Sequence, residues 1–176
     1  MKLDELVAAL AAGDKGAFAE LYEQTKKTVY YVALSVVRDR ALAEDVMQTA
    51  YLNVIRHAGS FRAGTNAAAW IARIARNEAL NLKKKRARET PLDGEDPAAF
   101  GSVETDDYGL LVDLARRTLP ADEFTILMLA AAEGYKRREI AAILEMPLAT
   151  VTWKYGRAVR AMRHALREKE GKDEDV

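Results

Sequence analysis

The sequence predicts an all-α protein with two small helical domains joined by a flexible acidic linker, and three observations lead to this prediction. Apolar residues recur every three or four positions along most of the 176 residues, whereas strand-like alternation is nowhere sustained. Proline and glycine interrupt an acidic stretch near the middle of the chain. A single proline divides the last long helical pattern into two helices. The predicted units are a three-to-four-helix bundle over residues 1–88, the linker 89–109, a helical domain over 110–168 and a charged tail over 169–176.

The N-terminal domain is expected to contain three long amphipathic helices. Asp14 is a candidate N-cap for the first helix, which ends at the polar triplet 38–40, and the second helix covers about residues 41–57. Glycines between residues 58 and 66 predict a loop before the third helix, which starts near Ala67 and continues into a basic cluster. The apolar residues that mark the inner faces of these helices are Phe18, Leu21, Tyr22, Val29, Val32, Ala33, Val36, Leu42, Val46, Met47, Ala50, Tyr51, Val54, Ile55, Trp70, Ile71, Ile74, Ala75 and Leu82.

Charge is segregated along the chain although the formal net charge is zero. Residues 73–88 hold seven basic residues and one acid, residues 89–113 hold eight acids and no base, and residues 136–169 hold nine basic residues and three acids. The low apolar content of residues 90–109, together with their prolines and glycines, is typical of a linker. Two basic modules therefore flank an acidic connection, and each module has to be considered separately as a nucleic-acid binder.

The C-terminal domain is expected to contain helices near residues 110–118, 121–133, 136–144 and 148–168. Proline costs ~3 kcal/mol inside a helix but fits its first turn, so Pro147 predicts a turn between the last two helices. This arrangement is a helix-turn-helix, which can place its second helix in a DNA major groove, and an ordinary helical hairpin stays open as the alternative. The apolar residues expected to close the pair are Ile140, Ala141, Leu144, Leu148, Val151 and Tyr155.

The composition argues against several classes of site. The chain has no cysteine, and its two histidines, His57 and His164, are too far apart in sequence for a metal-binding motif; both are expected to be exposed on helices. Nucleophile motifs and phosphate-binding glycine loops do not occur, which predicts a protein that is not an enzyme and uses no cofactor or metal. Without a signal peptide or a long apolar run, a cytoplasmic protein that does not insert into the membrane is expected.

Three stretches of the sequence form a specific pattern together. They read AEDVMQTAYLNVIRHAGSF, then AAWIARIARNEALNLKKKRAR, then LPADEFTILMLAAAEGYKRREIAAILEMPLATVTWKYGRAVRAMRHAL. In this order, and with the acidic linker before the third, they resemble bacterial RNA polymerase sigma factors of the extracytoplasmic-function (ECF) group. The resemblance covers about residues 17–88 as region two and 110–166 as region four. It implies an alternative sigma factor that binds core RNA polymerase, recognises a two-part promoter and helps to melt promoter DNA.

The resemblance implies that the second helix docks on the clamp helices of the largest polymerase subunit and that region four contacts the flap of the second-largest subunit. It also implies an anti-sigma factor that covers the polymerase-binding faces. Leu52 and Ile55 could instead complete the core, and Asp45 could be an internal hydrogen-bond acceptor. Thr49 stands where the family commonly has glutamate. The residues assigned to polymerase binding are Asp45, Gln48, Thr49, Leu52, Asn53, Ile55 and Arg56.

The third helix and the loop before it are implied to bind the minus-ten promoter element. An extruded base needs stacking surfaces and amide hydrogen bonds, and Asn77 matches the position at which the family reads a flipped base. Trp70 is part of either the melting segment or the core. The cluster 83–88 either binds phosphates or is a solvated helix end favoured by the helix dipole. The residues assigned to minus-ten binding are Phe61, Arg62, Asn66, Trp70, Arg73, Asn77, Lys83, Lys84 and Arg86.

The second helix of the helix-turn-helix is implied to read the minus-thirty-five element, since arginine binds guanine edges or phosphate and threonine can contact a base. Three positions depart from the family pattern. Glu145 stands where the turn usually has glycine, so either a left-handed backbone there is strained or the turn is built differently. Thr152 and Trp153 replace a basic and a small residue, and Trp153 either contacts a thymine methyl or packs against the preceding helix. The residues assigned to minus-thirty-five binding are Thr150, Thr152, Trp153, Lys154, Arg157 and Arg160.

The acidic linker is either a solvated tether or a segment that enters the active-site cleft and RNA exit path of the polymerase, where its acids would mimic RNA. We hypothesise the second role from the eight acids of residues 89–113. Two other functions stay open for the whole chain: a stand-alone helix-turn-helix transcriptional regulator, and an adaptor that binds only proteins. Dependence on polymerase separates the three, because a regulator binds its operator alone and an adaptor has no promoter preference.

Overall fold

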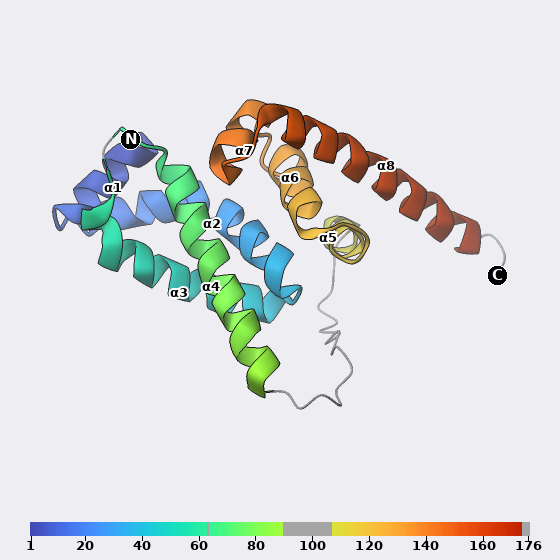
Figure 1. Ribbon diagram of the computed structural model, residues 1–176, viewed down its shortest axis with the longest axis horizontal. Helices are drawn as coiled ribbons and strands as arrows, with labels where there is room; N and C mark the ends of the chain where they lie inside the picture. The colour runs from blue at the N-terminus through green and yellow to red at the C-terminus, as the bar shows by residue number, and fades with distance from the viewer. Residues whose placement is uncertain (63, 90–106, 174–176) are drawn as a thin grey trace.

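The computed structural model describes residues 1–62, 64–89 and 107–173, and all regular structure within these ranges is helical (Figure 1). The predicted all-α class is therefore confirmed. Within the same ranges, no helix is both long and apolar enough to cross a membrane. The elements in chain order are α1 Leu3–Ala11, α2 Gly16–Val37, α3 Arg40–His57, the single 3-10 turn η1 Ala58–Ser60, α4 Ala67–Glu89, α5 Asp107–Thr118, α6 Ala121–Ala131, α7 Arg137–Leu144 and α8 Leu148–Asp173.

The N-terminal module, α1 to α4, is built around α2. Leu21 and Val29 of α2 are fully buried, and α3 and α4 pack along this helix with Val54 and Ile71 in the same apolar cluster. Apolar side chains at three- and four-residue spacing put one stripe of each helix toward a common centre. The predicted inner faces of these three helices are thus largely confirmed, although Ile55 lies outside the core.

The first helix, α1, is an element that we did not predict from the sequence. It contributes two fully buried side chains, Leu6 and Val7, to the N-terminal core. Asp4 Oδ1 accepts a hydrogen bond from the backbone N of Ala67 at 3.0 Å, so α1 satisfies one of the free N–H groups at the start of α4. The position of α4 therefore depends on the N-terminal residues of the chain.

Most of the other helix boundaries lie within a few residues of their predicted positions. The prediction of Asp14 as the N-cap is wrong by one residue, because α2 follows Lys15; Asp14 Oδ1 still accepts a hydrogen bond from Gly16 N at 2.8 Å. α5 begins inside the predicted linker and α8 extends into the predicted tail. The remainder of the linker, residues 90–106, lies outside the described residues.

The C-terminal module, α5 to α8, contains the predicted helix-turn-helix. Glu145, the C-cap of α7, is left-handed with φ 53° and ψ 42°, and the N–H of Met146 bonds the carbonyl of Ala141 at 3.0 Å. Val151 of α8 is fully buried beside α7. The prediction that Leu148 helps to close the pair is wrong, because its side chain lies in the first turn of α8 and is 41% exposed.

The two modules pack directly against each other. Figure 1 shows α6 and α7 facing the N-terminal module, and α6 contacts α2 while α7 contacts α4. Tyr31 of α2 meets Phe124 of α6 edge to face, with ring centroids 6.4 Å apart. Buried residues of both modules belong to the same apolar clusters. In this conformation the chain has a continuous core across the two predicted domains.

Candidate nucleic-acid interface

A hollow of about 440 Å³ lies at the start of α4. Its wall brings together five residues assigned to minus-ten binding that are up to twelve positions apart in the sequence: Phe61, Arg62, Asn66, Trp70 and Arg73. The rings of Phe61 and Trp70 lie 5.4 Å apart at 54°, so the hollow has an aromatic side, and the guanidinium of Arg73 adds a positive charge. Aromatic faces and a nearby cation are the groups that bind an unstacked base and its phosphate.

Hydrogen bonds between side chains and the backbone hold the loop in front of α4. Asn66 Oδ1 accepts from Ala69 N at 3.0 Å and so caps the helix, and the Thr65 hydroxyl donates to the carbonyl of Arg62 at 2.7 Å. The Ser60 hydroxyl donates to the carbonyl of His57 at 2.7 Å. Because the oxygen of Asn66 is used by the helix, its amide nitrogen is the group that remains for a base.

Trp70 belongs to the core and to the hollow. It is half-buried, packs against the N-terminal cluster and also lines the hollow beside Phe61. The two alternatives left open by the sequence are therefore not exclusive. A tryptophan in this position can present one face to a base while its other face is held by the protein.

The other four residues assigned to minus-ten binding lie further along α4 and do not line the hollow. Asn77 is one turn after Arg73, on the same face of the helix, and its side chain is exposed. Lys83, Lys84 and Arg86 are also exposed, near the C-terminal end of α4. The hollow and Asn77 thus form one surface, and the basic cluster 83–88 lies about two to three turns beyond Asn77 on the same helix.

The residues assigned to minus-thirty-five binding lie along α8, and two of them are anchored by acids of α6. Lys154 Nζ lies 2.6 Å from Asp122 Oδ2, and Arg157 Nε lies 3.4 Å from Glu123 Oε1. Glu123 is buried, which makes this pair a fixed support for an exposed arginine. Thr152, Trp153 and Arg160 are exposed, and Thr150 is half-buried.

Trp153 does not pack against the preceding helix, and that alternative is wrong. Its side chain is 56% exposed, and the guanidinium of Arg157 lies over its ring at 4.7 Å from the centroid. Gly156 lies three residues further along α8. A Cβ added at this position would be 3.6 Å from an Arg160 nitrogen, which is an ordinary contact distance. Arg157 therefore contacts both the Trp153 ring and the buried carboxylate of Glu123, and the side chains of Trp153 and Arg157 are exposed to solvent.

The face of α3 assigned to polymerase binding is on the surface. Leu52 and Ile55 are 55% and 44% exposed, so the alternative that they complete the core is wrong. The side chains of Asp45, Gln48, Thr49 and Arg56 are exposed too, which removes the role of Asp45 as an internal acceptor. Asn53 is half-buried and donates to Glu78 Oε1 of α4 at 3.0 Å, so it ties two helices together.

His57 is exposed at the end of α3, as is His164 on α8, as predicted.

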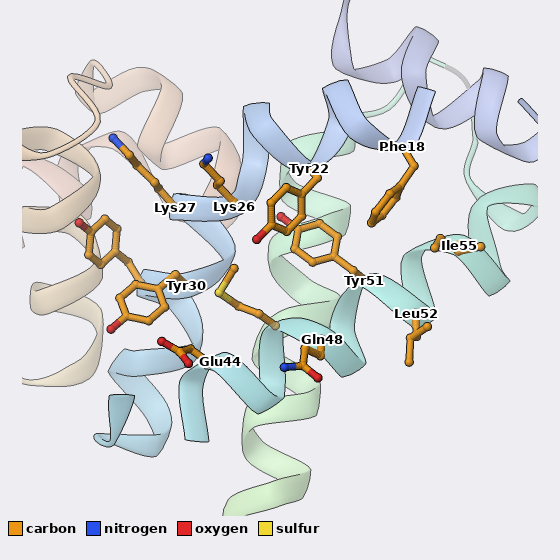
Figure 2. A pocket seen from close by; sticks show the side chains of 12 residues that line it. Phe18, Tyr22, Lys26, Lys27, Tyr30, Glu44, Gln48, Tyr51, Leu52 and Ile55 are labelled. Carbon is orange, nitrogen blue, oxygen red and sulfur yellow. The ribbon is translucent and has the colours of Figure 1, made fainter. Parts of the chain in front are cut away.

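A groove of about 770 Å³ opens between α2 and α3, and Figure 2 shows its lining. Gln48, Leu52 and Ile55 contribute to one side. The other side was missed by sequence analysis: Phe18 and Tyr22 were assigned to the core by their spacing, but both are only half-buried and line the groove. The residues contributed by α2 are Phe18, Tyr22, Lys26, Lys27, Tyr30 and Tyr31.

The floor of the groove is rigid and aromatic. Tyr51 packs against Tyr22 with ring centroids 4.9 Å apart, and its hydroxyl shares a 2.8 Å hydrogen bond with Thr25. Burial raises the pKa of Tyr51 well above its usual value, and burial also raises the pKa of Tyr30. Both phenols therefore stay neutral at physiological pH, and the charged side chains that line the groove, among the residues that the structure describes, are Lys26, Lys27 and Glu44.

Comparison with known protein families identifies both modules. Residues 21–89 match sigma-70 region 2, and residues 110–162 match sigma-70 region 4. The RNA polymerase sigma-H factor of Pseudomonas aeruginosa is 30% identical over an alignment 178 residues long. The alignment includes 92% of this chain and 92% of that protein. The ECF RNA polymerase sigma factor SigM of Mycobacterium tuberculosis is 30% identical over 156 residues, covering 88% of this chain and 79% of that protein.

Solved structures resemble the fold as well. The sigma factor RpoE of Bartonella quintana, in complex with the anti-sigma factor NepR, has a TM-score of 0.61 and is 25% identical, with 85% of this chain and 96% of that chain covered. CnrH, in complex with the cytosolic domain of CnrY, has a TM-score of 0.65 at 19% identity, with 94% and 97% covered, and shows a similarity of fold.

Proposed function

This chain belongs to the ECF group of the sigma-70 family and is an alternative sigma factor that directs transcription initiation, and we propose that three of its surfaces divide that work. Residues 1–88 bind core polymerase and the minus-ten element, and residues 110–168 bind the minus-thirty-five element. Sigma factors are transcription initiation factors. This chain would contribute by binding polymerase and promoter DNA and by capturing an unstacked base, and it would catalyse no chemical step itself. The chain would act in the cytoplasm, with promoter DNA and core polymerase as its partners.

The observation that carries the proposal is the hollow at the start of α4. It brings together the rings of Phe61 and Trp70, the side-chain amide of Asn66, which caps α4, and the guanidinium of Arg73. A base that leaves the duplex loses its stacking and hydrogen bonds, and such a hollow returns both. Phe61 and Trp70 would stack on the base, Asn66 and Asn77 would donate or accept at its edge, and Arg73 would hold the adjacent phosphate. The basic cluster of α4 would follow the strand without reading sequence.

The C-terminal module would read the minus-thirty-five element with α8. Arg157 pairs with the carboxylate of Glu123, and its guanidinium lies over the ring of Trp153. Because these contacts already restrict the side chain, little of its freedom is lost when it contacts a base or phosphate. Lys154 and Arg160 are suited to phosphates, and Thr150 and Thr152 to base edges. Binding of α8 to the minus-thirty-five duplex would place the hollow at the start of α4 near the promoter segment that melts.

The exposed face of α3 would dock on the clamp helices of the largest polymerase subunit, and the C-terminal module would contact the flap of the second-largest subunit. Exposed Leu52 and Ile55 beside polar Gln48 and Arg56 fit a helical partner. An anti-sigma factor is also proposed as a partner, since a relative of 25% identity was solved with one. The groove between α2 and α3 adjoins the polymerase face, so a protein seated there would block polymerase.

The proposed role of the acidic linker falls mainly on residues 90–106, which lie outside the described residues. We propose, from its charge alone, that it enters the RNA path of the polymerase. Replacing its acids with serine is expected to weaken holoenzyme assembly or to alter early transcription. If neither property changes, the linker is only a tether.

Run-off transcription tests the proposed function as a whole. Purified core polymerase, with and without this protein, would transcribe a fragmented genomic library. Discrete new transcripts that share two spaced upstream motifs are expected. A protein that binds an operator without polymerase and yields no new transcripts would be a stand-alone regulator, and this proposal would be rejected.

A further inference from the structure

An exposed tryptophan, Trp153, stands on the outer side of α8. Its side chain is 56% exposed, although an indole is among the largest apolar groups that a protein can bury. Val151 and Ala158 of the same helix are fully buried, so α8 packs on its module through the opposite side. The helix therefore presents the indole to solvent.

Trp153 is the first residue of a stripe along α8. Gly156, Arg157 and Arg160 follow three, four and seven positions later, and residues at this spacing share one face of a helix. Both arginines are exposed, and Gly156 is half-buried. The face thus carries an aromatic ring, two guanidinium groups and one position without a side chain.

The guanidinium of Arg157 is held by two contacts. Its central carbon lies 4.7 Å from the centroid of the Trp153 ring, and its Nε lies 3.4 Å from Oε1 of Glu123, a buried carboxylate of α6. The pairing with Glu123 uses Nε and does not use the two terminal nitrogens. Two guanidinium nitrogens of this kind can donate together to O6 and N7 of guanine in the major groove.

The distance between the ring and the guanidinium is close to the distance between neighbouring base pairs. Successive base pairs of B-DNA are ~3.4 Å apart, and the two side-chain groups are 4.7 Å apart. When Arg157 donates to a guanine, the indole of Trp153 therefore lies at the level of an adjacent base pair. The apolar group that a base pair presents in the major groove is the C5-methyl group of thymine.

Gly156 gives independent support for contact with DNA on this face. Glycine inside a helix is less favourable than alanine. A Cβ at this position would be 3.6 Å from an Arg160 nitrogen, an ordinary contact, so the described packing does not require a glycine here. Between Trp153 and Arg160, the missing side chain leaves room for the edge of a base pair to approach the helix.

We propose that Trp153 and Arg157 read one two-base step of the minus-thirty-five element, a guanine next to a pyrimidine that carries a C5-methyl group. Arg157 donates to the guanine, and Trp153 contacts the methyl group. Glu123 is a positioning residue that fixes the plane of Arg157. Thymine and 5-methylcytosine have this methyl group, whereas uracil and cytosine do not. The inference rests on the proposed function, because it assigns base preferences to the helix proposed to read this element.

A selection experiment tests the preferred step. Holoenzyme, assembled from core polymerase and this protein, selects DNA from a library of one promoter found by run-off transcription and randomised over its minus-thirty-five region. The bound sequences are expected to share a guanine whose neighbouring base pair contains thymine. A shared motif without such a step would overturn the inference.

The selected promoter then allows single chemical groups of the step to be removed. Uracil in place of thymine deletes only the methyl group and is expected to weaken holoenzyme binding about fourfold, the effect of leaving one carbon unburied. Cytosine at the same position should gain about fourfold when it is methylated at C5. Replacing guanine by 7-deazaguanine deletes one acceptor and should weaken binding at least about threefold. Equal affinities for the thymine and uracil promoters would overturn the inference.

Protein variants assign each loss to a side chain. Trp153→Ala should bind the thymine and uracil promoters equally and keep the loss with 7-deazaguanine, whereas Arg157→Ala should not respond to 7-deazaguanine. Glu123→Gln should reduce the loss with 7-deazaguanine and leave the loss with uracil unchanged. Leu110→Ala, at an exposed position of α5, is the control and should keep both losses. If Trp153→Ala distinguishes uracil from thymine as the unmodified protein does, the inference is wrong.

Run-off transcription keeps the two proposals apart. New transcripts from a promoter on which thymine and uracil are bound alike would refute the reading of the methyl group and leave the sigma function intact. A protein that gives neither transcripts nor a selected motif with core polymerase would refute the proposed function, and this inference with it.

Discussion

The basic helices α4 and α8 hold their arginines in different ways. On α8, Arg157 and Lys154 are held by Glu123 and Asp122 of their own module. On α4, Arg73 and Arg76 meet Glu145 and Asp122, which belong to the opposite module. The acids that pair with α8 therefore hold its predicted DNA-binding side chains from within the same module, whereas the acids that pair with α4 come from the other module. The proposed minus-thirty-five surface is thus arranged within one module, whereas the acid contacts of α4 depend on how the two modules pack.

The largest expected effect concerns Phe124, the fully buried neighbour of Glu123 on α6. Phe124→Ala removes a core ring that packs on Tyr31, and we expect the free energy of unfolding to fall by ~3–5 kcal/mol. Denaturant unfolding followed by circular dichroism measures it. Leu110→Ala, at an exposed position of α5, is the control and should change stability by less than ~0.5 kcal/mol. Similar losses for both variants would mean that α6 does not anchor the supporting acids.

The second prediction tests whether α8 is arranged in advance. Arg157→Ala is expected to cost ~1–3 kcal/mol in binding to the minus-thirty-five duplex, because a base or phosphate contact is lost. Glu123→Gln should act in the same direction with a smaller effect, since Arg157 loses its support. Arg163→Ala, exposed on the same helix, should have little effect. A Glu123 variant with tighter DNA binding would show that this acid covers the arginine and would remove the contrast with α4.

The third prediction concerns base capture in the hollow. Phe61→Ala is expected to cost ~1–3 kcal/mol in binding to a single strand that carries the minus-ten element, through lost stacking. Binding to the minus-thirty-five duplex should not change. Leu80→Ala, exposed on α4 outside the hollow, serves as the control. An equal loss for both variants would argue that Phe61 only supports the loop.

The α3 face provides a reference that is independent of both basic surfaces. Leu52→Ala is expected to weaken binding to core polymerase by about 1 kcal/mol, since an exposed leucine at an interface is buried on docking. Affinity for DNA of the free protein should stay unchanged. If DNA binding falls as well, the face is coupled to the hollow.

The smallest effect is predicted for the strained turn. Glu145→Gly should relieve the left-handed backbone and raise the free energy of unfolding by about 0.5–1 kcal/mol. The same change removes the contact with Arg73. The distribution of distances between spin labels at positions 12 and 164, one in each module, should therefore broaden while stability rises. A variant that gains stability without any change in distances would show that Glu145 contributes nothing to the contact between the modules.

Helical periodicity was enough to predict α2 to α8 and the order of the predicted surfaces. It predicted a position on a helix and not what faces that position, which is why Phe18 and Tyr22 were placed in the core although they line the groove. The nine residues of α1 have a helical pattern too, but so short a helix is stable only through its packing on the others, which the pattern does not contain.

The packing of the modules could not be predicted from the sequence. Arg38 was interpreted only as part of a helix end, and its partners lie 78 and 81 positions away. By contrast, the departure of Glu145 from the family pattern left either a strained left-handed residue or a differently built turn, and the structure has the left-handed residue. What the sequence did not contain was the ion pair of this side chain, because Arg73 lies 72 positions away.

The most direct test of the account compares the same spin-labelled protein, carrying labels at positions 12 and 164, in two states. The first state is the free protein, and the second is its complex with core polymerase and promoter DNA. We predict one narrow distance for the free protein and a clearly longer one in the complex, because the two elements are roughly 85 Å apart at ~3.4 Å per base pair. The same distance in both states would contradict the account, since the hollow and α8 would then reach their elements without separating.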